Sequence, residues 1–203
     1  MKTKFGFLIL GLGLVFTLSC TKYPPSSDRL TEDLAIVTQY DTKIDFNNYK
    51  TYSIANSITK ITDKDTTNIT DANATAILDQ IAKNMEKRGF VKSVAPQKPD
   101  LGIQVLYFQN TEVYVYYYDW WGYYPYWYYY YPYPSTYYYS YTTGMGNIEL
   151  IDLKNANTAS NILYIRWNAY IRGLLTGNHS QSEMLNGIDQ AFIQTPQLQT
   201  SAK

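Results

Sequence analysis

Few residues in this sequence have the types and spacing that catalysis requires. His179 is the only histidine, and it directly precedes Ser180, where we predict that a helix begins. At that position an exposed flanking residue is a better interpretation than a general base. Serine and threonine are abundant, but no G-x-S-x-G turn presents a serine as a nucleophile. The sequence therefore predicts a protein that is not an enzyme.

Acidic side chains come close together at Glu32-Asp33 and again at Asp63 and Asp65. Such pairs can bind Ca²⁺ or provide the two carboxylates of a glycosidase. Lys64 separates the second pair, and solvated loop charge is the better interpretation of both. With one histidine and one cysteine, the chain also lacks the usual ligands of a zinc site. We predict no metal and no cofactor.

Cys20, the only cysteine, directly follows the apolar run from Phe5 to Leu18, and two lysines precede that run. A positive start, an apolar core and a small residue, here Ser19, are the parts of a signal peptide. The run is shorter than the roughly 20 residues that an α-helix needs to cross a bilayer. The arrangement resembles a bacterial lipoprotein signal, which implies that residues 1–19 are removed and that a lipid on Cys20 anchors the protein to a membrane. The alternatives are an uncleaved anchor and an ordinary secretory signal.

Charge and the residue after Cys20 bear on partners and location. The chain has 17 basic and 17 acidic residues, and no Lys or Arg lies between Lys98 and Lys154. Because binding to a phosphate backbone needs clustered cations, we expect no nucleic-acid partner. Thr21 stands where an aspartate would favour retention in the inner membrane. We therefore expect an outer-membrane lipoprotein of the cell envelope, and its periplasmic or surface orientation stays open.

The segment from Tyr114 to Tyr141 departs most from an ordinary domain, because it holds 16 of the 23 tyrosines and three of the four tryptophans. Glu112, Val113 and Val115 could extend a preceding strand, but Gly122 and three prolines interrupt regular structure beyond it. We predict a long Tyr/Trp-rich loop, inserted at about 112–143, whose candidate binding residues are Trp120, Trp121, Tyr123, Tyr124, Tyr126, Trp127 and Tyr128.

Four interpretations of this loop compete. Its aromatic faces could stack on sugars, contact an envelope protein or a second copy, or lie at a lipid headgroup boundary. It could also be a low-complexity insertion without a ligand. Our hypothesis is a lipid-anchored binding protein of the cell envelope that uses the loop as its contact surface. A structural envelope lipoprotein with no specific ligand and a glycan-binding module are the alternatives.

The remaining sequence indicates one domain that positions this loop. After a lipidated tether at 20–30, residues 31–203 predict an α+β fold of two layers, with a mostly antiparallel sheet and two helices in the order ββαβββα. Periods of two and of 3.6 residues place strands at 34–40, 49–54, from 100, 148–153 and 161–171, and helices at 71–88 and from 180 to Pro196. Polar residues 57–70 predict an exposed loop.

The last two strands predict an antiparallel hairpin with an apolar inner face. Its inward residues would be Leu163, Ile165, Trp167, Ala169 and Ile171. Ser180 and Glu183 have the spacing of a capping box at the start of the second helix. Gly89 offers a left-handed cap at the end of the first.

Short motifs in a fixed order resemble domain of unknown function 4136, a family of bacterial envelope lipoproteins. The resemblance implies an envelope lipoprotein with no established activity, and it carries over no catalytic residues. It extends roughly from Leu34 to Pro196 and rests on Asp45-Phe46, Tyr49-Lys50-Thr51-Tyr52, Lys87-Arg88-Gly89-Phe90, Pro99-Asp100-Leu101, Gly146-Asn147-Ile148, Leu150-Ile151-Asp152-Leu153, Trp167, Ile188, Ala191 and Phe192.

Overall fold

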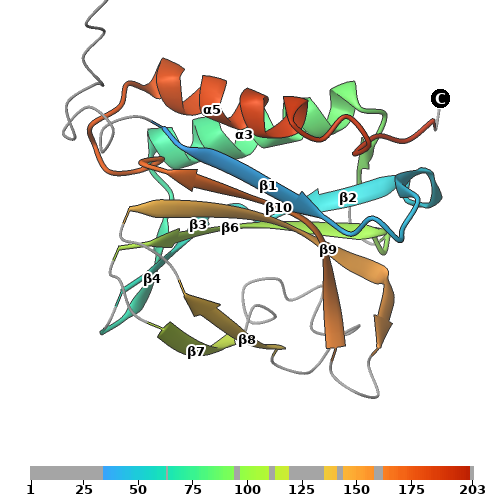
Figure 1. Cartoon of the computed structure of the whole chain (residues 1–203), viewed down its shortest axis with the longest axis horizontal. Helices are drawn as coiled ribbons and strands as arrows, with labels where there is room; N and C mark the ends of the chain where they lie inside the picture. The colour runs from blue at the N-terminus through green and yellow to red at the C-terminus, as the bar shows by residue number, and fades with distance from the viewer. Residues whose placement is uncertain are drawn as a thin grey trace, which may run out of the picture. The chain divides into compact units, whose positions relative to one another are not determined.

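The computed structural model describes residues 34–62, 64–93, 97–109, 113–118, 135–140, 144–157 and 162–201. Helices α3 (Ala72–Lys87) and α5 (Gln181–Ile193) form one layer on one face of a mixed eight-stranded sheet (Figure 1). The predicted α+β class with two helices is confirmed. The predicted signal peptide, tether and Cys20 lie outside the described residues.

The sheet has the strand order β1-β10-β9-β6-β2-β5, and β3 pairs with both β6 and β4. The pairs β1–β10, β10–β9 and β9–β6 are antiparallel, whereas β2 and β3 run parallel to β6. Strands β1, β2, β6, β9 and β10 correspond to the predicted ones. The bounds are β1 (Ile36–Tyr40), β2 (Thr51–Ile54), β3 (Ile58–Ile61), β4 (Thr66–Ile69), β5 (Val91–Lys92), β6 (Leu101–Phe108), β9 (Met145–Asn157) and β10 (Ile162–Arg172), with a 3-10 turn η2 (Phe46–Asn48) between β1 and β2.

The prediction of an exposed loop at 57–70 is wrong. Strands β3 and β4 form an antiparallel hairpin there, and β3 also pairs with the central strand β6. Ile58 and Ile61 are buried, and the apolar surface that they remove from water stabilises the hairpin. The mostly polar composition of the segment gave no indication of this burial. The connecting turn is closed by Thr62, whose hydroxyl donates to Asp65 O at 3.0 Å.

The prediction of one long loop across the Tyr/Trp-rich segment is wrong at both ends. Strands β7 (Val113–Tyr118) and β8 (Ser135–Ser140) pair with each other in a separate antiparallel sheet. The preceding strand β6 ends at Phe108 and does not continue through Val115. β-branched and aromatic residues favour strands, and here that preference prevails over a loop. Residues 119–134 lie outside the described part of the chain.

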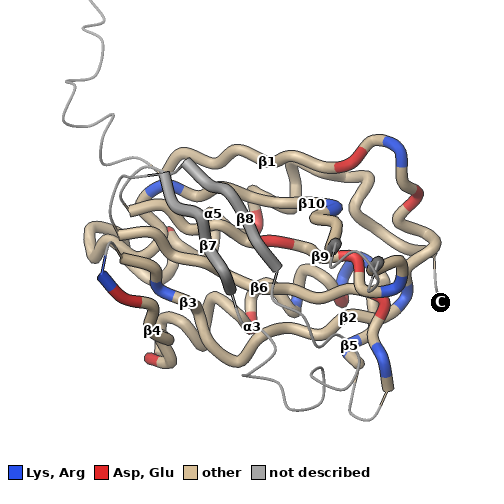
Figure 2. Tube along the Cα trace, turned by 90° about the horizontal axis from the view of Figure 1, so that it is seen from below, with Lys and Arg blue, Asp and Glu red and all other residues tan. Residues whose placement is uncertain are grey.

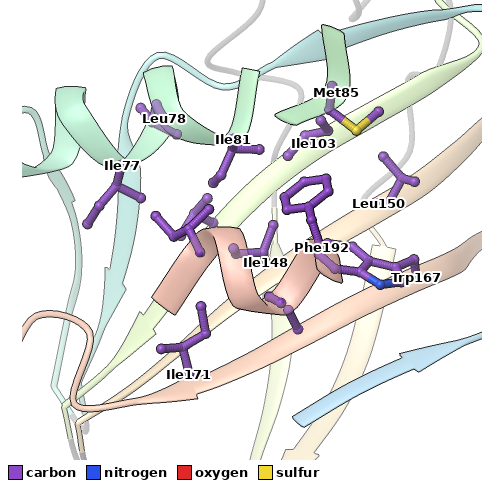
Figure 3. Packing of buried hydrophobic residues seen from close by; sticks show 14 of the residues in the cluster. Ile77, Leu78, Ile81, Met85, Ile103, Ile148, Leu150, Trp167, Ile171 and Phe192 are labelled. Carbon is purple, nitrogen blue, oxygen red and sulfur yellow. The ribbon is translucent and has the colours of Figure 1, made fainter. Parts of the chain in front are cut away.

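The core lies between the helices and the sheet. Figure 3 shows Ile77, Leu78, Ile81 and Met85 of α3 and Phe192 of α5 packed toward apolar side chains of the sheet. Each helix therefore contributes one apolar face to the core. Both helix starts are also as predicted, since Asp71 caps α3 by accepting from Ala74 N at 2.8 Å and Ser180 forms the capping box with Glu183. Strand β6 is buried on both faces, as befits a central strand.

A β-bulge explains why the predicted inner face of β10 holds over only part of its length. Ile165 pairs with Ile151 and Trp167 pairs with the adjacent Leu150, so Arg166 is an additional residue between two regular stretches. Trp167, Ala169 and Ile171 are buried as predicted. Leu163 and Ile165 are only half-buried and lie outside the core, because the bulge interrupts the alternation.

The chain after α5 packs against the end of α3. Helix α3 ends with Arg88 as its C-cap, and Arg88 donates to the carbonyls of Phe192, Thr195 and Leu198 beyond or at the end of α5. Gly89 follows with φ +90°, and a Cβ at this position would lie 2.5 Å from Thr200 O. This close approach of two backbones requires glycine.

Candidate functional site

The sequence-based candidates for binding lie outside the described residues. This holds for Cys20 and for Trp120, Trp121, Tyr123, Tyr124, Tyr126, Trp127 and Tyr128. The structure does describe the strands that flank the aromatic candidates. Strands β7 and β8 are in register from Val113 opposite Ser140 to Tyr118 opposite Ser135. Residues 119–134 therefore connect two paired strand ends.

The residues of the main sheet on either side of this segment lie next to each other. Phe108, the last residue of β6, pairs with Met145, the first of β9, and Gly144 N donates to Phe108 O at 2.8 Å. The Tyr/Trp-rich segment thus leaves and re-enters the domain at two adjacent points of neighbouring strands. An insertion at such a position can present a surface without changing the register of the sheet.

Those of the residues considered for catalysis that the structure describes are not assembled into a site. His179 packs against Gly173, where an added Cβ would lie 2.8 Å from His179 Nε2. Asp65 caps its own turn by accepting from Thr66 N at 2.7 Å. Ser57 and Lys60 have the S-x-x-K spacing, but they lie on or beside strand β3, where residues three apart point to opposite faces. The other three carboxylates, Glu32, Asp33 and Asp63, are outside the described residues.

Two other features are absent from the described part of the chain. No group of three or more His, Cys, Asp or Glu side chains gathers among those residues. No helix among them is long and apolar enough to span a bilayer.

Arg166 organises a cluster of polar side chains that sequence reasoning missed. Its Nε donates to Asp152 Oδ2 at 2.9 Å, and its Nη1 donates to Asp41 Oδ2 at 2.7 Å. Asp152 is fully buried and also accepts from the Tyr49 hydroxyl at 2.7 Å and from Asn155. The bulge in β10 places the guanidinium between the two carboxylates. A buried ion pair with this many hydrogen bonds is held in one geometry.

The hydrogen bonds also determine the ionisation of the cluster. Burial alone would raise the pKa of Asp152, but hydrogen bonds from Asn155, Tyr49 and Arg166 outweigh it and hold that pKa below its ordinary value. The pKa of Asp41 is lowered by the hydrogen bond from the Lys43 backbone and by Arg166. Burial and the nearby Asp152 raise the pKa of Tyr49 to about 12. These shifts keep Asp41 and Asp152 ionised and Tyr49 protonated near neutral pH.

Two open hollows flank Arg166. The first, which we call the edge hollow, has a volume of about 350 Å³ and is lined by Gln39, Tyr40, Asp41, Arg166, Asn168 and Tyr170, among others. The second, the loop hollow, has a volume of about 440 Å³ and is lined chiefly by Lys43, Asp45, Asn48, Lys154, Asn155 and Arg166. Figure 2 shows charged residues of both signs gathered around the loop that follows β1 and the neighbouring end of β10.

A second polar cluster lies on the sheet face opposite the helices. Glu149 is fully buried, and its carboxylate accepts from Gln104 Nε2 and, at 2.7 Å, from Asn147 Nδ2. Gln104 Oε1 has no hydrogen-bond partner among the described residues. The cluster links the central strands β6 and β9.

Most of the short sequence motifs prove to be structural. Asp45 caps η2, Phe46 is in the core, and Tyr52 is fully buried. Asp100 Oδ2 accepts from Lys50 N and Thr51 N, at 2.7 and 3.1 Å. These contacts join the start of β2 to the start of β6. These motif residues therefore help to specify the fold.

Comparisons with known proteins identify a family but no activity. The profile of the family Domain of unknown function (DUF4136) matches residues 36–197. A crystal structure of a DUF4136 family protein from Bacteroides thetaiotaomicron is 30% identical, with a TM-score of 0.62 over 82% of this chain and 97% of that one. No curated protein is detectably similar to the sequence.

Two further structures resemble the chain more distantly. A PDZ domain protein from Parabacteroides distasonis is 17% identical, with a TM-score of 0.45, over 81% of this chain and 36% of that one. A PelC dodecamer from Paraburkholderia phytofirmans is 16% identical, with a TM-score of 0.42, over 83% of this chain and 99% of that one. Similarity at this level supports no functional inference.

Proposed function

This chain belongs to the DUF4136 family, and from that premise we propose that it is a lipid-anchored cell-envelope protein that acts by binding and not by catalysis. Its anchor is a lipid on Cys20, and its membrane is the outer membrane. Its contact surface is formed by residues 119–134, the part of the Tyr/Trp-rich segment between β7 and β8. The signal-like sequence before Cys20 supports the anchor. The absence of an assembled catalytic constellation among the described residues favours binding.

The observation that carries the proposal is the paired stem formed by β7 and β8. Its six residue pairs end at Tyr118 opposite Ser135, and the intervening 16 residues include three tryptophans. Aromatic rings supply large contact areas at a small cost in side-chain entropy. The β7–β8 pair lies between β6 and β9 in the sequence, and residues 119–134 connect its two strand ends. An envelope protein is the favoured partner, because buried aromatics dominate protein interfaces.

The stem allows a precise deletion. Replacing residues 119–134 with Asn-Gly joins Tyr118 to Ser135 through the two-residue turn that antiparallel strands prefer. We expect this variant to keep its thermal midpoint and to lose its main cross-linked partner in intact cells. Quantitative mass spectrometry after cross-linking would measure the loss. A shortened variant that keeps every partner would contradict the proposal.

Substitution of Trp120, Trp121 and Trp127 tests the same surface without shortening the chain. The triple alanine variant is the test, and the triple phenylalanine variant is its control. The triple alanine variant should weaken partner capture about tenfold or more, as expected for interface aromatics. The triple phenylalanine variant keeps flat apolar faces and should retain most of it. If polysaccharide pull-down changes in this order while protein partners do not, the glycan-binding alternative is favoured. If neither readout changes, the structural lipoprotein without a ligand is favoured.

The lipid anchor makes a separate prediction. Mass spectrometry of the mature N-terminus should find an acylated Cys20, and Cys20→Ala should abolish this modification. Because two acyl chains anchor stably where one is marginal, any Cys20→Ala chain that is still cleaved should move from the membrane to the soluble fraction. Membrane retention of a cleaved Cys20→Ala chain would contradict the anchor, as would an unmodified N-terminus at another residue in the natural chain.

A further inference from the structure

The main sheet ends at β1 with an edge to which no other strand of the described residues is paired. β1 is the terminal strand and pairs only with β10. Figure 2 shows it outermost, beside β10. Such an edge presents unpaired N–H and C=O groups and is a template for pairing with a further strand. Proteins usually protect their edge strands against such pairing, by short strands and charged side chains among other means.

The other edges of the sheet carry this protection, and β1 does not. β5 has only two residues, one of which is the exposed Lys92. β4 has four residues, and the turn before it holds Lys64 and Asp65. β1 has five residues with the sequence Ile-Val-Thr-Gln-Tyr, which contains no charge, no proline and no glycine. Its pairing with β10 is regular and without a bulge, so nothing turns this edge away from a partner.

The register with β10 shows which backbone groups of β1 face the free edge. Alternate residues bond to β10, beginning with Ala35, whose carbonyl accepts from Arg172 N at 2.9 Å. The residues between them face away from β10, and these are Ile36, Thr38 and Tyr40. Among the hydrogen bonds of the described residues, one reaches these outward groups, from Gln194 Nε2 to Ile36 O at 3.4 Å. This bond is longer than an ordinary backbone bond of about 2.9 to 3.0 Å, so a strand can replace it.

The side chains of β1 leave apolar surface exposed on both faces of the sheet. Val37 and Tyr40 are 56% and 37% exposed, and they are two of the five exposed large hydrophobic side chains among the described residues. Tyr40 pairs with Trp167 and lies on the face that carries the helices. Val37 pairs with Tyr170 and lies on the opposite face. A strand added beside β1 would therefore cover apolar surface on both faces.

We propose that the free edge of β1 binds β1 of a second copy of this chain, as an antiparallel pair with its twofold axis at Thr38. An interface of this kind is closed, because both copies contribute the same residues. Thr38 then lies opposite Thr38 of the second copy. Since the backbone groups of Thr38 face the edge, the two residues exchange both N–H···O bonds. The two half-sheets join into one continuous sheet.

The sequence of β1 complements itself in this register. Ile36 lies opposite Tyr40 of the second copy, a pairing of β-branched and aromatic side chains that stabilises sheets. Val37 lies opposite Gln39 of the second copy on the other face. All three outward residues of each copy find a partner, whereas a shifted register would leave some of them unpaired. A charged edge would repel its own copy, and the uncharged β1 avoids this cost.

Cysteine substitution tests the register in the full chain, purified in detergent. Opposite residues of a hydrogen-bonded antiparallel pair have Cα atoms about 5.5 Å apart, within the range that a disulfide bridges. Thr38→Cys should therefore form a cross-linked dimer on mild oxidation, seen on a non-reducing gel, well above any dimer that the natural chain forms through Cys20.

Val37→Cys is the matched control for the cross-link. Val37 is the more exposed position, but in this register it lies diagonal to Val37 of the second copy, at about 7 to 8 Å. It should therefore cross-link no more than the natural chain does. A Thr38→Cys chain that stays monomeric overturns the proposal, and so does a Val37→Cys chain that cross-links equally well.

Paired charges test the interface without a cross-link. With Val37→Lys and Gln39→Lys together, each new lysine lies directly opposite another, so sedimentation equilibrium should show that the dimer of the natural chain is lost. With Val37→Lys and Gln39→Glu, opposite charges face each other and the dimer should persist. Both positions are exposed, so circular dichroism of the two variants should match that of the natural chain. A natural chain that is monomeric at millimolar concentration overturns the proposal, as does a dimer unaffected by the paired lysines.

This interface consists of described residues and requires neither the Tyr/Trp-rich segment nor the lipid. It therefore stands or falls independently of the proposed function, and the chain in which Asn-Gly replaces residues 119–134 separates the two. A dimer that persists in that chain and is lost with the paired lysines supports pairing through β1. A dimer that is lost on replacement and kept with the paired lysines overturns the proposal and assigns self-association to residues 119–134.

Discussion

Replacing Trp167 with alanine is expected to lower the free energy of unfolding by about 3 to 5 kcal/mol, the usual loss for a large aromatic side chain in a core. Trp167 is 2% exposed, and its ring centroid lies 5.1 Å from that of Phe192 in α5. Its Nε1 donates to Thr195 Oγ1 at 3.0 Å, so the substitution also removes a buried hydrogen bond. Urea denaturation followed by circular dichroism would measure the change.

Two further variants serve as controls for the stability change in Trp167→Ala. Trp167→Phe keeps most of the packing and loses the hydrogen bond, so its loss should be smaller than that of Trp167→Ala. Val37→Ala alters an exposed side chain on the neighbouring strand and should change stability by less than about 0.5 kcal/mol. If Trp167→Ala left the denaturation midpoint unchanged, the facing of β10 described above would be wrong.

Removing the buried carboxylate of Asp152 is expected to be as damaging. Asp152→Ala leaves the Arg166 guanidinium with only one carboxylate and the buried Tyr49 hydroxyl without its acceptor. Breaking one side of a buried ion pair typically costs about 3 to 5 kcal/mol. Tyr49→Phe, which removes one hydrogen bond and no charge, should lose only about 1 kcal/mol. A loss for Asp152→Ala no larger than that of Tyr49→Phe would show that the charge contributes little.

The same carboxylate predicts a dependence of stability on pH. Because the pKa of Asp152 is lower in the folded protein than in the unfolded chain, its contribution is complete above the unfolded value of about 3.9. The contribution is lost as the pH falls through the lower folded value. Asp152→Asn should therefore flatten the fall in stability below about pH 4. Asp79→Asn, at an exposed position of α3, is the control, and an acid profile equal to that of Asp152→Asn would contradict the assignment.

The sequence contained enough to place both helices and five strands, because these elements carry strong periods and clear caps. Strands β3 and β4 were missed because Ile58 and Ile61 are the only buried apolar side chains in a polar stretch. Strands β7 and β8 were missed because prolines nearby argued for a loop. The bulge at Arg166 has no local signal, since it results from the pairing of β10 with β9. Tertiary pairing here overrides local preference.

Some of the candidate sites were predicted from the sequence, and others were found only in the structure. Cys20 and the aromatic residues were chosen from composition, and their roles stay predictions. The Arg166 cluster was not foreseen, although Asp152 and Arg166 are charges of opposite sign within two apolar strands of one predicted hairpin. Two opposite charges within apolar strands that pair with each other could have indicated a buried ion pair. The hollows could not be foreseen, because β1 and the loop after it approach β10 from the far end of the sequence.

The pairing of β1 with β10 also constrains the order of events during biogenesis. Ile36 pairs with Ile171, and the segment after α5 closes against Arg88 and Asn47. Contacts between residues so distant in sequence form slowly, because a long loop must close before they contribute. The sheet cannot be completed on a nascent chain that still lacks Ile171. The fold is therefore completed only after nearly all of the chain has been synthesised, which is compatible with the export that the proposed envelope location requires.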